Sequence, residues 1–277
     1  MVDLNLIAVS LGLFIGLLMG ITGAGGAIVS LPLLMYLFDI GLKEAAPIAL
    51  LATAVSAGLA SIIGLRQGIV RYKAASLLAI MGVIMAPIGV YAAHHVGTFW
   101  LQLLFIALLF YVATQALLSK ITPDSVQDSL SLQNTIPCAL NPITAKLFWT
   151  ASCTKKLLLT GSIAGFISGL LGVGGGFIVM PVLQKLSNLE HRMVVATSLA
   201  MTTLIALVSV ISYAGFVTVK WHVAVPFVIA TMIGTLFVKL KAVNVTVAQS
   251  RLMFGIISLL ISITMAVQLA YEAINFN

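Results

Sequence analysis

Six long apolar stretches limit the fold of this chain more than any other feature. They contain no Asp, Glu, Lys or Arg and cover residues 45–65, 74–93, 99–118, 193–214, 222–238 and 252–271. Because a helix needs about 20 apolar residues to cross the hydrocarbon core of a bilayer, each stretch has the length of a transmembrane helix. Only 8% of the residues are charged, against about 25% in soluble domains. The sequence therefore predicts an all-α polytopic membrane protein.

Two further apolar segments, 4–38 and 157–187, are interrupted by glycines. The first contains "GITGAGGAIVSLP" at 20–32 and the second "GLLGVGGGFIVMP" at 169–181, so the same pattern returns after 149 residues. Under this shift, Gly12, Gly16, Gly20, Gly23, Gly25, Gly26 and Pro32 align with Gly161, Gly165, Gly169, Gly172, Gly174, Gly175 and Pro181. The chain is therefore expected to contain two repeats, each a glycine-broken segment followed by three full spans.

The basic residues decide between two topologies. If each broken segment crosses the membrane, eight of the 14 basic residues fall on one side and six on the other. If each broken segment is a re-entrant hairpin, the repeats are inverted and the division is twelve against two. Since Lys and Arg concentrate in cytoplasmic loops, the inverted arrangement is favoured. We expect one transmembrane domain (1–277) in the inner membrane, with repeat one at 1–119, a cytoplasmic linker at 120–156, repeat two at 157–277 and both termini outside.

The glycine clusters are predicted to form an anion site. A helix N-terminus presents unpaired N–H groups and about half a positive charge, and glycine lets a ligand approach the backbone closely. Short helices at about 27–38 and 177–187 would bring two such ends together near the middle of the membrane. The candidate ligand-binding glycines are Gly23, Gly25, Gly26, Gly172, Gly174, Gly175 and Gly176. The alternative, tight helix packing, is preferred for Gly12, Gly16 and Gly20.

Hydroxyl side chains near the glycine clusters are candidates to complete this site. The predicted contacts are Thr22 beside the first cluster, Thr53 on the span that follows it, and Thr197 and Ser198 on the equivalent span of the second repeat. Ser30, Ser56 and Ser168 lie in similar positions. The alternative is that each hydroxyl bonds to its own helix backbone, as Ser and Thr in membrane helices commonly do.

Several functions find no support in the sequence. No Asp or Glu lies in the middle of a span, and no enzyme motif, metal-ligand spacing or cofactor fingerprint is present. The chain is therefore expected to be no enzyme, to need no cofactor or metal, and to bind no nucleic acid, with its basic residues setting topology. His94, His95 and His222 fall on the outer side, where interfacial anchoring is favoured over gating. Glu44 is expected to form a solvated pair with its neighbour Lys43.

The doubled glycine-rich segment ending in proline, followed each time by three spans, resembles the TauE/SafE family of sulfite exporters. The resemblance covers about 4–119 and 157–272, and it implies an inner-membrane permease for small anions such as sulfur oxyanions or organosulfonates. Two features depart from the family pattern. The first repeat has "PIALLATA" with Leu50 and Leu51 where the second has the polar "VVATSLA", and Ala27 stands where the second repeat has Gly176.

These observations together predict a secondary transporter of small anions, such as sulfite or sulfoacetate, that works by alternating access around a midplane site at the two tips. The partners would be the anion, the lipid bilayer and a coupling ion, either a proton or sodium. Two alternatives stay open: an anion channel, and a non-transporting assembly factor that acts through the 119–156 loop.

Overall fold

The computed structural model describes residues 2–23, 26–118, 151–187, 190–241 and 247–275. Over these residues the chain forms helices. Their bounds are α1 Val2–Thr22, α2 Gly26–Phe38, α3 Leu42–Arg66, α4 Tyr72–His95, α5 Thr98–Leu118, α6 Ala151–Leu171, α7 Gly176–Leu186, α8 His191–Ala214, α9 Trp221–Leu240 and α10 Val247–Asn275.

The six predicted spans are confirmed as helices α3, α4, α5, α8, α9 and α10, each long and apolar enough to cross a membrane. The all-helical polytopic fold predicted from the sequence is therefore correct. Several boundaries differ by a few residues, and the start of α6 differs most. Helix α6 begins at Ala151 rather than at 157, so Cys153 lies on its first turn, where it is buried and disulfide-bonded.

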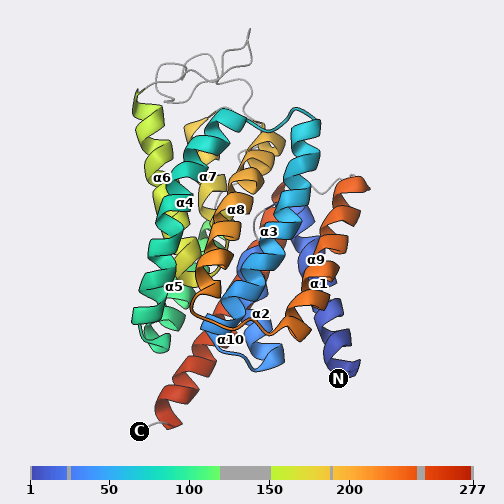
Figure 1. Ribbon diagram of the computed structural model, residues 1–277, viewed down its shortest axis with the longest axis vertical. Coiled ribbons are helices and arrows are strands. Elements are labelled where there is room, and N and C mark those ends of the chain that lie inside the picture. The colour runs from blue at the N-terminus through green and yellow to red at the C-terminus, as the bar shows by residue number, and fades with distance from the viewer. Residues whose placement is uncertain (1, 24–25, 119–150, 188–189, 242–246, 276–277) are drawn as a thin grey trace.

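The two glycine-broken segments are hairpins that start from opposite ends of the helix bundle. Helix α1 begins at the lower end of Figure 1, where α10 also ends, and the chain returns to that end at the start of α3. Helix α6 begins at the upper end, and the chain returns there at the start of α8 (Figure 1). The two hairpins therefore enter the bundle from opposite ends.

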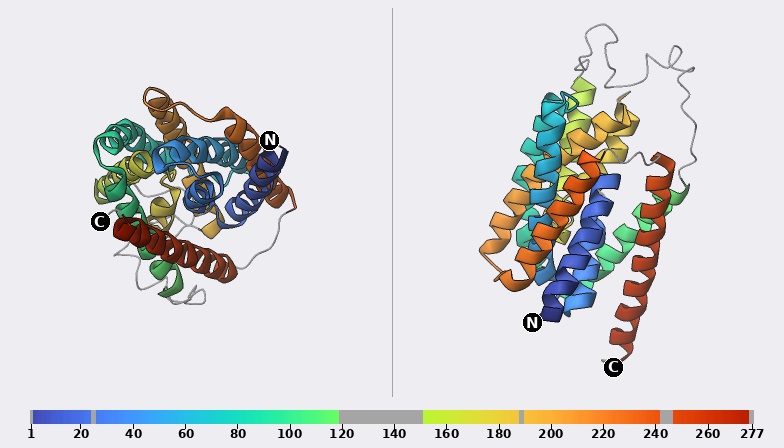
Figure 2. Two further views of the ribbon diagram at one scale, coloured as in Figure 1. Left: turned by 90° about the horizontal axis from the view of Figure 1, so that it is seen from below. Right: turned by 90° about the vertical axis from the view of Figure 1, so that its right-hand side faces the viewer.

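Each hairpin packs mainly on the other half of the chain. The most extensive helix contacts join α1 to α9 and α6 to α4, and the repeat relates these two pairs to each other. Helices α3 and α8 pack on each other between them, while α5 and α10 form a pair at the side of the bundle (Figure 2). The two halves therefore interlock and form one body.

Small residues explain how close α1 comes to α9. A Cβ atom built on Gly12 would lie 2.6 Å from the carbonyl oxygen of Phe227, and one on Gly16 would overlap the backbone of Thr231. The hydroxyl of Thr235 donates a hydrogen bond to the carbonyl oxygen of Gly16 at 3.1 Å. The preferred interpretation of these glycines, tight helix packing, is confirmed.

The same packing recurs between α6 and α4. A Cβ atom on Gly161 would lie 2.5 Å from the carbonyl oxygen of Leu78, and one on Gly165 would overlap the backbone of Gly82. Helices α5 and α10 instead expose large apolar side chains, including Phe110 at 53% and Val267 at 65%. Exposed apolar surface of this extent suits a lipid environment.

Candidate functional site

The first tip joins α1 to α2. Gly23 ends α1 with a φ of +83°, and its N–H donates to the carbonyl oxygen of Met19 at 2.9 Å, which closes the last turn. A Cβ atom on Gly23 would overlap the side chain of Val195 on α8. Gly26 begins α2, while the predicted site residue Gly25 lies outside the described residues.

The second tip joins α6 to α7 and is described completely. Gly172, Gly174 and Gly175 have φ values of +75°, +74° and +67°, a region that side chains rarely adopt. The N–H of Gly172 donates to the carbonyl oxygen of Ser168 at 2.8 Å. Gly175 is the N-cap of α7 and Gly176 its first residue, so the four predicted glycines lie together at one helix N-terminus.

Several backbone N–H groups at this tip have no hydrogen-bond partner among the described residues. They belong to Val173, Gly174, Gly175 and Phe177, all of which are buried. Buried N–H groups without a partner are rare in proteins, and water or a ligand usually satisfies them. At the positive end of a helix dipole, an anion is the ligand that such groups favour.

Apolar side chains of both halves cover the tips. The Cδ1 atom of Leu31, on α2, lies 3.2 Å from the Cβ position of Gly172, and Ala46 of α3 lies against the same glycine. Met180, which the 149-residue shift relates to Leu31, packs on a cluster containing Met19 and Val195. The two hairpins thus contact each other through apolar side chains near the tips.

The four predicted hydroxyls all donate to their own helices. Thr22 bonds to the carbonyl oxygen of Leu18 at 2.8 Å and Thr53 to that of Ala49 at 2.7 Å. On α8 the corresponding donors are Thr197 and Ser198, whose acceptors are the carbonyl oxygens of Met193 at 2.6 Å and Val195 at 2.9 Å. Each of these hydroxyls therefore already donates its proton to a backbone oxygen. This is the alternative in which Ser and Thr bond to their own helix backbone.

Thr197 has a second contact that joins the repeats. Its hydroxyl oxygen accepts a hydrogen bond from the backbone N–H of Arg71 at 3.1 Å, just before α4 begins. This bond fixes the start of α4 against α8. We infer a structural role for Thr197.

The structure identifies two further polar residues near the second tip. Ser168 lies one turn before Gly172, and its buried hydroxyl has no hydrogen-bond partner among the described residues. Tyr213, at the end of α8, donates its hydroxyl proton to the carbonyl oxygen of Gly169 at 2.9 Å. The sequence pointed to Ser168 by its position, but no sequence pattern pointed to Tyr213.

Charged residues surround the end of the bundle where α3 begins. The ammonium group of Lys220 pairs with the carboxylate of Glu44 at 2.8 Å, so the predicted pairing of Glu44 with Lys43 is wrong. Lys43 instead donates to the carbonyl oxygens of His94 at 3.3 Å and Val96 at 3.1 Å. Glu44 pairs with Lys220, just before α9, and not with its sequence neighbour, because the side chains of Lys43 and Glu44 leave α3 in different directions.

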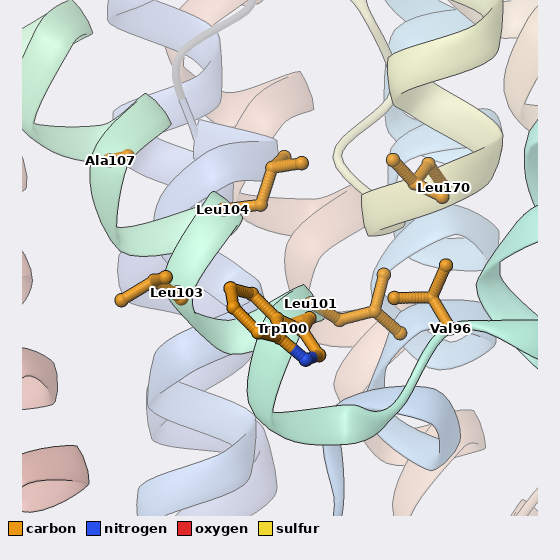
Figure 3. A pocket seen from close by; sticks show the side chains of 7 residues that line it. All are labelled: Val96, Trp100, Leu101, Leu103, Leu104, Ala107 and Leu170. Atoms are coloured by element: carbon orange, nitrogen blue, oxygen red, sulfur yellow. The ribbon is translucent and has the colours of Figure 1, made fainter.

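A small cavity lies beside the second tip, and it does not suit an anion. Its volume is about 280 Å³, and it lies between α5 and the end of α6. Figure 3 shows its lining side chains, Val96, Trp100, Leu101, Leu103, Leu104, Ala107 and Leu170. None of the predicted site residues lines it. In the part of the chain that the structure describes, no three His, Cys, Asp or Glu residues are grouped to hold a metal ion.

Comparisons with known proteins give a consistent result over most of the chain. The family described as "Sulfite exporter TauE/SafE" matches residues 8–265. A "Probable membrane transporter protein" of Xylella fastidiosa (strain 9a5c) is 26% identical over 262 residues, which cover 93% of each chain. The "Probable membrane transporter protein YjnA" of Bacillus subtilis (strain 168) is 27% identical over 232 residues, covering 82% of this chain and 85% of that protein. No solved structure gives a significant match.

Proposed function

The chain belongs to the sulfite exporter TauE/SafE family, and from this membership and the geometry of the second tip we propose that it is a secondary transporter of a small anion. The observation that supports this proposal most directly is the group of buried, unpartnered N–H groups at the N-terminus of α7. Such donors at the positive end of a helix favour an anion.

The proposed substrate is a sulfur oxyanion or an organosulfonate, such as sulfite or sulfoacetate. The oxygens of such an anion can accept hydrogen bonds from several backbone N–H groups at once. A helix terminus contributes about 0.3–1 kcal/mol to binding a charge, and up to about 2 kcal/mol where it is partly buried. A site built from backbone groups, with the Ser168 hydroxyl beside it, therefore binds weakly enough to release its substrate.

The proposed mechanism is alternating access of the two interlocked halves. In the arrangement described, which we assign to a closed state of this cycle, Leu31 and Ala46 lie against Gly172 of the second tip. Opening of the second tip requires these side chains to move away from Gly172. Met180 packs on the cluster of Met19 and Val195, so it is placed to cover the first tip in the same way. The coupling ion would be a proton or sodium, which flux measurements with imposed gradients distinguish.

The proposed orientation places both termini outside and the start of α6 in the cytoplasm. Lys43 and Lys220 lie where α3 and α9 begin, at the end of the bundle that holds the termini (Figure 1). Arg66, Arg71 and Lys73 lie at the opposite end, between α3 and the first turn of α4. This distribution follows the tendency of basic residues to stay in the cytoplasm.

Replacing Gly174 by Ala tests the site with a matched control. Both Gly174 (φ +74°) and Gly68 (φ +71°) are in the left-handed region, but Gly68 lies in the turn between α3 and α4 with nothing within 4 Å of its Cβ position. Each substitution costs about 1 kcal/mol of backbone strain. In proteoliposomes loaded with sulfite or sulfoacetate, we expect Gly174→Ala to abolish flux and Gly68→Ala to keep it.

Equal flux in the two variants would contradict the assignment. The same assay tests the alternative functions. A channel would pass the anion without counterflow exchange, and an assembly factor acting through the 119–156 loop would show no flux at all.

A further inference from the structure

A second cavity, of about 950 Å³, lies away from the glycine tips. Three parts of the chain enclose it: α2 with its connection to α3, the first turns of α5, and the second half of α10. The lining residues are Pro32, Leu33, Met35, Tyr36, Asp39, Ile40, Gly41, Gln102, Ile106, Leu260, Ile261, Ile263, Thr264, Met265, Val267, Gln268, Leu269 and Tyr271. None of the predicted anion-site residues is among them.

The lining changes from apolar to polar along the cavity. Leu260 and Ile106 lie at its inner end, whereas Gln102, Gln268 and Asp39 lie toward the end of the bundle that holds the termini. From Leu260 to Tyr271, α10 rises about 16 Å at 1.5 Å per residue. This is about half of a 30 Å hydrocarbon core, or one leaflet. The cavity therefore matches an amphiphile that lies in one leaflet.

The charge at the polar end argues against a small anion as the occupant. Asp39 has no ion-pair partner among the described residues, since Lys220 is taken by Glu44. The closest basic residue in the sequence, Lys43, is bonded to backbone oxygens at the end of α4. A carboxylate left without a cation in this position repels anions and attracts an ammonium group.

The helices around the cavity also face lipid. On α10, Val267 is 65% exposed and Tyr271 68% exposed, and both line the cavity. Helix α10 packs extensively on α5 but only slightly on α1 and α2. An occupant from the bilayer would fill this space and connect the α5–α10 pair to the first hairpin.

We propose that this cavity binds one phospholipid with a primary ammonium head group, of the phosphatidylethanolamine class. Its acyl chains lie between α2 and α10, and its ammonium group pairs with Asp39. The lipid belongs to the leaflet on the side of the termini. The binding is independent of the anion site.

Two substitutions test the head-group contact and the space for the acyl chains separately. Asp39→Asn removes the charge but keeps a residue that tolerates the left-handed φ of +48° found there. Thr264→Trp fills the cavity from α10. Ile256→Trp is the matched control, because Ile256 lies on the same helix, is 50% exposed and does not line the cavity.

Native mass spectrometry of the full chain, purified in a mild detergent with equimolar phosphatidylethanolamine and phosphatidylcholine of identical chains, measures the bound lipid. We expect the wild-type protein and Ile256→Trp to keep one phosphatidylethanolamine. Asp39→Asn should lose about tenfold in its preference for that lipid, the size of one hydrogen bond to a charged group. Thr264→Trp should lose both lipids.

Three results would overturn the proposal: a wild-type protein without bound lipid, an unchanged head-group preference in Asp39→Asn, or full lipid retention in Thr264→Trp. Should Thr264→Trp fail to fold, the comparison of Asp39→Asn with the wild-type protein still decides the head-group assignment.

Discussion

At the scale of single residues, the structure separates candidate hydroxyls that already donate to their own helices from two, Ser56 and Ser168, that are buried without a partner among the described residues. Thr22, Thr53, Thr197 and Ser198 donate to carbonyl oxygens of their own helices. Ser168 has a buried hydroxyl without a partner among the residues described. A sequence cannot make this distinction, because it depends on the rotamer and on which face of the helix meets the tip.

Ser168→Ala is therefore expected to weaken substrate binding without weakening the fold. Removing a buried hydroxyl that lacks a partner does not destabilise the protein, whereas losing one hydrogen bond to an anion costs about 1.5 kcal/mol, or about tenfold in affinity. Initial-rate flux measurements should give a KM raised about tenfold and an unchanged thermal unfolding midpoint. Thr53→Val, which removes a committed hydroxyl, is the control and should leave KM unchanged. A raised KM in Thr53→Val alone would reverse the two assignments.

At the scale of helices, most of the fold follows from the sequence. Spans such as 74–93 and 99–118 are uniformly apolar and uncharged, so their length alone predicts helices. The 149-residue shift also relates equivalent contacts. It pairs Leu31, which lies against the second tip, with Met180, which packs on the cluster of Met19 and Val195. The sequence predicts the start of α6 too late because Lys155 and Lys156, near the start of the helix, interrupt its apolar pattern.

The lipid cavity could not be predicted from the sequence. Its residues come from three elements that are far apart in the chain, and each residue taken alone is an ordinary member of an apolar helix or a turn. Only the fold brings Asp39, in the connection after α2, and Gln268, on α10, to one opening.

The contact of α1 with α9 gives a prediction at the scale of helices. Gly16→Leu would place a large side chain into the backbone of Thr231, whereas Gly41→Leu has nothing within 4 Å of its Cβ position. Overpacking of this kind typically costs about 1–3 kcal/mol. Thermal unfolding in detergent should show a clear loss of stability for Gly16→Leu and a small change for Gly41→Leu. Equal unfolding midpoints would show that α1 and α9 separate easily.

At the scale of the whole molecule, the proposed orientation makes a prediction about Cys153. The structure shows this residue in a disulfide near the end of the bundle that we place in the cytoplasm. Disulfides rarely persist in the reducing cytoplasm, so in cells we expect Cys153 to be a thiol. Acid quenching, denaturation and alkylation with a mass-tagged maleimide would detect it. A disulfide that persists in untreated cells would place this end outside and reverse the orientation.

The central claim is that backbone N–H groups at the second glycine tip bind the transported anion. Anomalous diffraction from crystals soaked in selenite, a heavier analogue of sulfite, tests this claim most directly. We expect a selenium peak with its oxygens within hydrogen-bond distance of the backbone nitrogens of Gly174, Gly175 and Phe177. A peak beside Arg71 or Lys43 instead, or no peak at a selenite concentration that saturates transport, would contradict it.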